Sequence, residues 1–139
     1  SAATLPVNLR QCINEFGVSK GIANFVLPVG VTVNMDGTSL YQAVAAVFIA
    51  QVFGIELTLG QQLLIVLTAL VSSIGTPGIP GGSIVMMIIV LNSVGIPVEG
   101  LALILGVDRP LDMLRTVVNV TGDVTVASIV AKSENELSN

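Results

Sequence analysis

The sequence predicts an all-α membrane protein whose transmembrane helices are broken and include a re-entrant helical hairpin. Three observations support this prediction: 53% of the 139 residues are hydrophobic, only 10% are charged, and residues 57–98 contain no charged side chain. Soluble domains carry roughly 25% charged residues because their surfaces must stay hydrated. This composition cannot supply such a surface, so we expect a multi-pass protein embedded in the lipid bilayer.

The same composition excludes several functions. Five Lys and Arg residues cannot form a surface that follows a phosphate backbone, which argues against nucleic-acid binding. The sequence contains no His and a single Cys, so common zinc sites and His-based catalysis are excluded and we expect no enzyme. Cys12 itself is interpreted as a small packed residue.

The first residues suggest part of a longer protein. The sequence starts at Ser1 without an initiator Met, and Ser1–Pro6 shows no basic segment followed by an apolar run, so we do not interpret it as a signal peptide. Because a span needs roughly 20 residues, a chain of this length holds at most about four or five spans. We therefore expect a fragment.

The first two predicted segments cover residues 1–17 and 20–53. Residues 4–15 mix apolar and polar side chains and predict a short helix that ends near Gly17. Residues 20–53 are long enough to span the bilayer. Their centre, Asn-Met-Asp-Gly-Thr at 34–38, places an acidic side chain and a helix-weakening glycine at bilayer depth, so we expect a broken span.

The third predicted segment, residues 58–97, is a hairpin. Its centre at 72–83 contains four Gly and two Pro, and the arms at 58–71 and 84–97 are about 14 residues long. Two full spans would need about 40 residues plus a turn, so the short arms favour a re-entrant hairpin with its tip inside the membrane. Backbone N–H groups at such a tip suit a carboxylate, although a glycine-rich loop alone is a weak indication.

The fourth predicted segment, residues 100–132, is a span with a polar stripe. At about 100° per residue, six polar side chains share an arc of about 100° on one helix face. They are Asp108, Asp112, Arg115, Thr116, Asn119 and Asp123. Placing such a face in hydrocarbon is costly unless it lines a site, so the stripe predicts a binding site. The structural alternative is an Arg115–Asp112 pair that fastens helices together.

Two oxygen-rich pairs could bind a hard cation. Asn34 and Asp36 lie at the predicted break, where free backbone carbonyls could join them, and Asn119 and Asp123 lie on the stripe. The residues alone do not distinguish Na⁺ from H⁺. The structural alternative is an Asn–Asp hydrogen bond that holds a kink.

Four pieces of the sequence, in this order, resemble the dicarboxylate/amino acid:cation symporter family, which includes the glutamate transporters and their prokaryotic homologues. The pieces are Ser1–Pro6, Asn34–Thr38, Ser73–Gly78 and Asp112–Asp123. The resemblance implies the C-terminal part of a glutamate-transporter-like transport domain. Its segments would be the second arm of a first re-entrant hairpin (1–17), the broken seventh span (20–53), the second hairpin (58–97) and the last span (100–132). The scaffold that forms the family's homotrimer would be absent from this chain, and the implied location is the plasma membrane.

The resemblance also implies the residues that bind the substrate. Arg115 would grip the side-chain carboxylate of an acidic amino acid, a bidentate contact suited to Arg, and Asp112 would bind the ammonium group. The other implied substrate positions are Ser1, Thr38, Gly78, Ile79, Thr116 and Asn119, with backbone groups acting at the hairpin tip.

Three Na⁺ sites are implied in the same way. The first comprises Gly30, Asn34, Asn119 and Asp123, the second Thr32, Ser73, Ile74 and Thr76, and the third includes Asn34 and Asp36. Na⁺ ions would be the coupling ions, and no other cofactor is implied.

The resulting hypothesis is Na⁺-driven symport of aspartate or glutamate by elevator-type alternating access, with the second hairpin as the gate. Asp123 stands where dicarboxylate carriers of the family often have Asn, which favours amino-acid substrates. Met113 stands where animal glutamate transporters tend to carry a second Arg, which argues against K⁺ counter-transport. The same-family alternative is H⁺-coupled glutamate or C4-dicarboxylate symport. The alternatives from other classes are a pore-lining fragment of a channel and a structural membrane fragment without a site.

Overall fold

The structure is a computed structural model that describes residues 1–138, and within them every regular element is a helix. In chain order the elements are η1 (Ala2–Thr4), α1 (Leu5–Asn14), α2 (Lys20–Val33), α3 (Asp36–Val52), α4 (Leu59–Ser73), α5 (Gly82–Ser93), η2 (Val98–Gly100), α6 (Leu101–Leu105) and α7 (Asp108–Ser133). This confirms the all-helical prediction.

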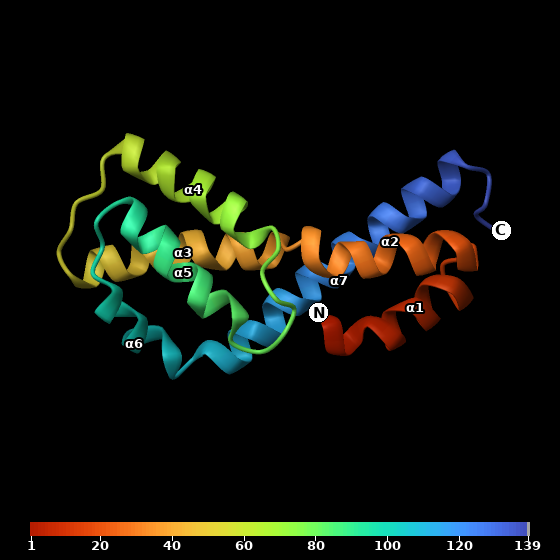
Figure 1. The fold of residues 1–139 in the computed structure, drawn as a ribbon, viewed down its shortest axis with the longest axis horizontal. Helices are drawn as coiled ribbons and strands as arrows, with labels where there is room; N and C mark the ends of the chain where they lie inside the picture. The colour runs from red at the N-terminus through yellow and green to blue at the C-terminus, as the bar shows by residue number, and fades with distance from the viewer. Residues whose placement is uncertain (139) are drawn as a thin grey trace.

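The helices form an elongated molecule (Figure 1). Helices α2 and α3 follow one another along the long axis, and α7 packs against both of them as well as against α1. Helices α4, α5 and α6 gather around the far part of α3. The start of the chain lies near the middle of the molecule, next to the junction of α2 and α3.

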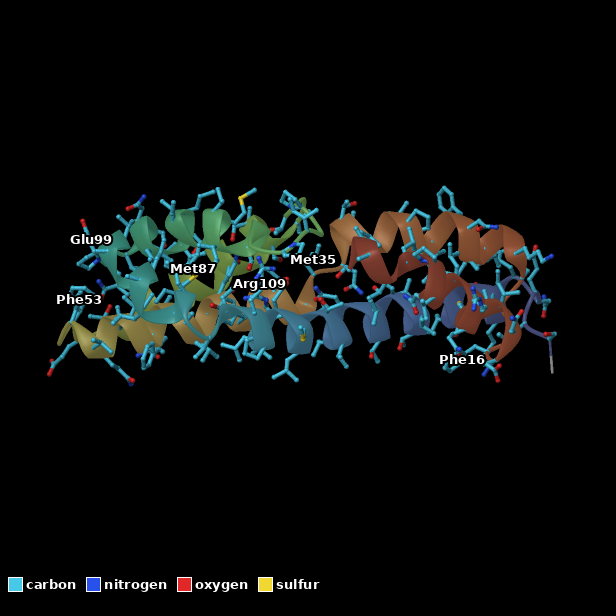
Figure 2. All side chains as sticks on the ribbon, turned by 90° about the horizontal axis from the view of Figure 1, so that it is seen from below. Phe16, Met35, Phe53, Met87, Glu99 and Arg109 are labelled. Atoms are coloured by element: carbon cyan, nitrogen blue, oxygen red, sulfur yellow. The ribbon has the colours of Figure 1, made fainter. Side chains whose placement is uncertain are left out.

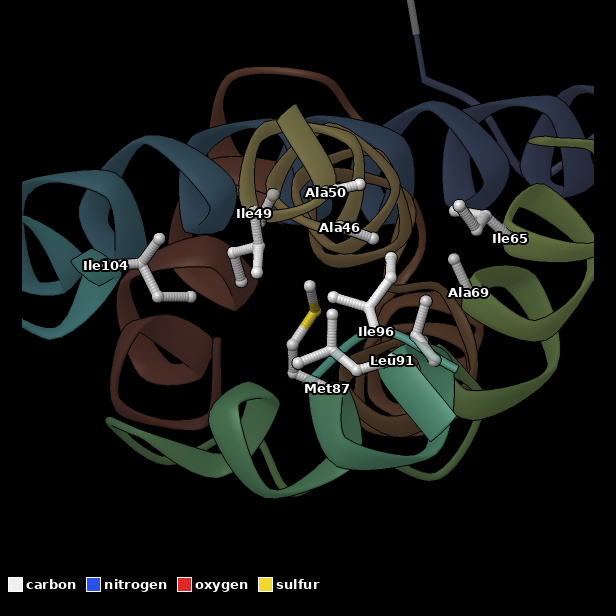
Figure 3. Close-up of a cluster of buried hydrophobic side chains, with 11 residues drawn as sticks. Ala46, Ile49, Ala50, Ile65, Ala69, Met87, Leu91, Ile96 and Ile104 are labelled. Carbon is white, nitrogen blue, oxygen red and sulfur yellow. The ribbon is translucent and has the colours of Figure 1, made fainter. Parts of the chain in front are cut away.

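Two hydrophobic clusters hold the helices together, one at each end of the molecule. The larger joins α3, α4, α5 and α6 (Figure 3) and contains Ala45, Ala46, Ile49, Ala50, Ile65, Ala69, Met87, Val90, Leu91, Ile96 and Ile104. The smaller joins α1, α2 and α7 and contains Cys12, Val18, Ala23, Leu27, Ala127 and Ala131. Cys12 is fully buried there, as a small packed residue should be. The region between the two clusters contains the polar groups.

The long rod of α2 and α3 is broken at Asn34 and Met35. Asn34 has φ −99° and ψ 85°, outside the helical region, and α3 restarts at Asp36. The helix thus breaks within the Asn34–Thr38 run, at its first two residues. The break leaves carbonyls at the end of α2 and N–H groups at the start of α3 without partners in their own helices.

Helices α4 and α5 pack against each other as two arms joined by residues 74–81. A capping box between Thr58 and Gln61 fixes the start of α4. At the other end of the hairpin, Gly75 and Gly81 both have φ +82°, a conformation that favours glycine. The glycines of this segment therefore allow the chain to reverse within a few residues.

The last segment differs from the expected single span over residues 100–132. The short helix α6 ends at Leu105, and α7 begins afresh at Asp108 after Gly106 and Val107. Pro110 lies in the first turn of α7, where its missing N–H group removes no helical hydrogen bond. Among the described residues, α7 is the one helix long and apolar enough to cross a membrane, while α4 and α5 are shorter apolar helices.

Helix α7 carries its polar residues inward. Asp108, Arg115, Asn119 and Asp123 are all at most 5% exposed, whereas Met113 is 71% exposed. The exposed residues of this stretch also include the apolar Leu114, Val117 and Val118, while Arg109 and Thr121 are its exposed polar residues. This burial pattern confirms that the predicted stripe occupies one face of the helix. It is the reverse of the pattern of a soluble protein and fits a helix whose outer face meets lipid.

Candidate functional site

A cavity of about 390 Å³ lies where the chain start, the α2–α3 break, the hairpin tip and α7 come together. Figure 2 shows Met35 of the break and Arg109 of α7 in this central region. The polar or charged side chains of its lining are Ser1, Thr4, Thr38, Thr76, Ser83, Arg109, Asp112, Thr116 and Asn119. The hairpin contributes Gly78 and Ile79 at its tip. The cavity therefore contains seven of the eight predicted substrate residues, all except Arg115.

Asn119 is the centre of the hydrogen bonds around this cavity. Its Oδ1 accepts the backbone N–H of Gly37 at 2.8 Å, which satisfies a free donor in the first turn of α3. Its Nδ2 lies 3.3 Å from Ser1 Oγ and 3.4 Å from Thr38 Oγ1. One amide thus ties α7 to the break and to the chain start.

The hairpin tip closes directly onto the chain start. The backbone N–H of Ala2 donates to the carbonyl of Gly78 at 3.2 Å. A Cβ added to Gly78 would lie 3.1 Å from that same nitrogen, so a larger residue there would press against the chain start. Ile79, the next residue of the tip, is 61% exposed. Because Gly78 and Ile79 both line the cavity, the tip forms one of its walls.

Arg115 is paired with two carboxylates of its own helix. It is buried beside the cavity but does not line it. Its Nη2 donates to Asp108 Oδ1 at 3.1 Å and to Asp112 Oδ1 at 2.9 Å, and its guanidinium lies 4.0 Å from the centre of the Tyr41 ring. Both ion pairs lie within α7, so they do not fasten α7 to another helix as the structural alternative supposed. Nε and Nη1 of Arg115 have no partner among the described residues.

The residues predicted for the first cation site meet in the structure. Asn34 Nδ2 donates to Asp123 Oδ1 at 3.0 Å, and a Cβ added to Gly30 would collide with the same carboxylate. Asn34 Nδ2 also lies 3.4 Å from the carbonyl of Asn119. The Asn–Asp hydrogen bond considered as an alternative is therefore present. It leaves Asp123 Oδ2 buried and without a partner in the described chain, as a cation ligand would be.

The residues predicted for the second cation site meet through their backbones. The N–H of Gly75 donates to the carbonyl of Thr32 at 2.8 Å, which brings the end of α2 to the end of α4. Ser73 and Thr76 are buried there, but their hydroxyls donate to backbone carbonyls of their own segment. The side chain of Ile74 is exposed, so Ile74 could ligate an ion only through its carbonyl.

Asp36 faces a second cavity of about 510 Å³, which Asn34, Thr121 and Gly122 also line. A Cβ on Gly122 would lie 2.5 Å from Asn34 Nδ2 and 3.2 Å from Asp36 Oδ2, so only glycine allows α7 to approach the break here. Among residues 1–138, no group of three or more His, Cys, Asp or Glu side chains gathers as a metal site. Amide, carbonyl and single carboxylate oxygens of this kind suit a hard monovalent cation better than a transition metal.

Three residues of this region were not predicted. Arg109 and Ser83 line the first cavity, and Tyr41 stacks on Arg115. The hydroxyls of Ser83 and Tyr41 are buried and have no partner among the described residues. Arg109 could have been found, because the helical rotation that defined the stripe puts it about 60° from Asp112. Ser83 and Tyr41 depend on tertiary contacts that their spacing does not indicate.

An all-helical fold that is apolar outside and polar inside, with a broken helix at a central cavity, is typical of helical membrane transport proteins. Residues 1–133 match the sodium:dicarboxylate symporter family, and the chain belongs to that family. The family is one of symporters, which are transport proteins and not enzymes.

Similar proteins include both animal and bacterial members. Excitatory amino acid transporter 3 of Mus musculus is 53% identical over 138 residues, 99% of this chain and 26% of that protein. Excitatory amino acid transporter 1 of Homo sapiens is 51% identical over 140 residues, the whole of this chain and 26% of that protein. The proton/sodium-glutamate symport protein of Bacillus subtilis (strain 168) is 46% identical over 134 residues, 96% of this chain and 31% of that protein. The chain thus spans about a quarter to a third of the length of these relatives.

Proposed function

We propose that this chain is the substrate- and ion-binding part of a Na⁺-coupled symporter of acidic amino acids, aspartate or glutamate. The observation that carries the proposal is the polar stripe of α7, which borders the central cavity and ends at Asp123, one of whose carboxylate oxygens has no partner within residues 1–138. Relatives that are about half identical bear the names of glutamate and excitatory amino acid transporters.

In this proposal the cavity holds the amino acid. Asp112 binds its ammonium group, Thr116 and Asn119 contact the α-carboxylate and amino group, and Thr38 lies near the side chain. Arg115 contributes through Nε and Nη1, the donors that its two aspartates leave free. Ser1 and the backbone at Gly78 and Ile79 contact carboxylates from the opposite wall.

Na⁺ binds next to the substrate in the same proposal. Gly30, Asn34, Asn119 and Asp123 form one site, Thr32 with Ser73, Ile74 and Thr76 a second, and Asn34 with Asp36 part of a third. Asn119 belongs both to the cavity and to the first ion site, so occupancy of one site would favour occupancy of the other.

The transport cycle would use the two-armed unit α4–α5 as a gate. It would be the second re-entrant hairpin, with residues 1–17 as the end of the first, and it would close over a loaded site. This portion would move as part of an elevator-like transport domain in the plasma membrane. A scaffold elsewhere in the protein would form the homotrimer.

The test is aspartate binding by calorimetry on the purified full-length protein, with NaCl exchanged for choline chloride at fixed pH. We expect the affinity to fall about 100-fold without Na⁺. The name of the bacterial relative favours H⁺ coupling as the second candidate. Affinity that ignores Na⁺ but changes with pH would support that candidate, and preference for succinate over aspartate would support a dicarboxylate carrier. Absence of binding in both salts would overturn the proposal.

A further inference from the structure

The charged side chains that line the central cavity are those of Arg109 and Asp112. Arg109 lies in the first turn of α7 and is exposed, and within residues 1–138 it takes part in no salt bridge or side-chain hydrogen bond. Arg115, by contrast, is buried and held by two carboxylates. Of the two guanidinium groups, that of Arg109 is therefore the one that is exposed and lines the cavity.

The charges beside the cavity explain why the guanidinium of Arg109 would matter for binding an anion. Asp108 and Arg115, which are buried, form one cluster with the partly exposed Asp112. Two carboxylates outnumber one cation in it, so the cluster carries a net negative charge. An acidic amino acid is itself a net anion and would be repelled by this cluster. Arg109 brings the local charge to neutral at the wall that the ligand must approach.

We propose that Arg109 is a specificity-determining residue of the cavity, and that its guanidinium attracts and binds a carboxylate of the anionic substrate. This inference rests on the proposed function and adds a residue to it. Because the side chain is long and exposed, it can reach toward the cavity when a ligand is present and stay hydrated when none is. A carboxylate bound in this way gains a charge-assisted hydrogen bond that a neutral amino acid cannot form.

The test uses the full-length transporter and three variants. Arg109→Gln removes the charge, Arg109→Lys keeps it, and Arg10→Gln removes the charge of an exposed arginine on α1 that does not line the cavity. Calorimetry measures aspartate affinity at fixed NaCl while choline chloride raises the ionic strength. We expect Arg109→Gln to weaken aspartate binding about tenfold and to flatten its dependence on ionic strength. Arg109→Lys should retain that dependence, and Arg10→Gln should behave as the unmodified protein.

Each other outcome has a distinct meaning. If Arg109→Gln binds aspartate with unchanged affinity and unchanged salt dependence, the inference is overturned while the proposed function stands. Weaker binding with an unaltered salt dependence assigns Arg109 a packing role and also overturns the inference. If the unmodified protein binds no aspartate in NaCl, the proposed function fails and this inference fails with it.

Discussion

The carboxamide of Asn119 on α7 caps α3 by accepting the backbone N–H of Gly37 at 2.8 Å. A helix that starts inside a protein needs such a partner, because its first N–H groups cannot bond within the helix. The same side chain lines the central cavity, and the backbone carbonyl of Asn119 accepts from Asn34 Nδ2 at 3.4 Å. The start of α3, the cavity and the first proposed ion site thus meet at one residue.

Replacing Asn119 by Ala should therefore impair both stability and binding. We expect a loss of roughly 1–3 kcal/mol in the free energy of unfolding, since the buried N–H of Gly37 would lose its acceptor. Aspartate affinity should fall at least about tenfold. Thermal unfolding and calorimetry measure the two effects, with Ser128→Ala on the same helix as the control. An Asn119→Ala variant that matches this control in stability and in aspartate affinity would contradict both roles of Asn119.

Gly30 and Gly21 give a matched pair of substitutions in α2. A Cβ at Gly30 collides with the carboxylate of Asp123, whereas a Cβ at Gly21 has only Ser19 Oγ nearby, at 4.0 Å. Gly30→Ala should displace Asp123 and raise the Na⁺ concentration needed for aspartate binding at least about tenfold. Gly21→Ala should leave the required Na⁺ concentration unchanged and stabilise α2 by up to about 1 kcal/mol. Equal Na⁺ dependence in both variants would rule out an ion site at Asp123.

Replacing Arg115 by Cys should abolish acidic amino-acid binding. It also leaves the buried carboxylate of Asp108 and the partly exposed one of Asp112 without their cation, for which we expect a loss of about 3 kcal/mol in stability. Adding Asp108→Asn removes one of those carboxylates and should restore part of the stability without restoring binding. Thermal unfolding and calorimetry on the single and double variants separate the two roles. Normal aspartate binding by Arg115→Cys would remove Arg115 from the proposed site.

Gln42 joins the two arms of the hairpin to α3. It is fully buried, its Oε1 accepts from Ser72 Oγ at 3.0 Å, and its Nε2 donates to the carbonyl of Ser83 at 3.4 Å. Gln42→Leu should lower the free energy of unfolding by about 1–3 kcal/mol, because buried partners lose their bonds. The control is Gln51→Leu on the exposed face of the same helix. Indistinguishable unfolding temperatures for the two variants would contradict this role.

The polar stripe of α7 could be predicted because helical rotation alone determines which residues share a face. The break at Asn34 was predictable for a similar reason, since polar residues and glycine interrupt an apolar run. The Arg115–Asp112 pair had been considered as an alternative, but rotation does not determine where a long side chain ends, so the second pair, with Asp108, could not be anticipated. The start of α7 at Asp108 was missed because residues 101–107 are apolar throughout.

Contacts between distant parts of the chain were beyond sequence reasoning altogether. The bond from Ala2 to Gly78 joins residues far apart in sequence, and no local pattern indicates it. The same holds for Tyr41, which stacks on Arg115 from α3. Such pairs follow from packing of whole helices and not from the spacing of residues within one helix.

Helix α7 is synthesised after every helix against which it packs, and this order has a consequence for biogenesis. Asn34 and Gly37 leave the ribosome before Asn119 and Asp123 are synthesised. The break between α2 and α3 therefore lacks these hydrogen-bond partners until α7 has been made. Both the proposed ion site and the proposed substrate site are then completed in one late step, when α7 packs against the earlier helices. A nascent chain that stops before Asp108 would therefore expose an unsatisfied break, which is the kind of defect that membrane quality control can recognise.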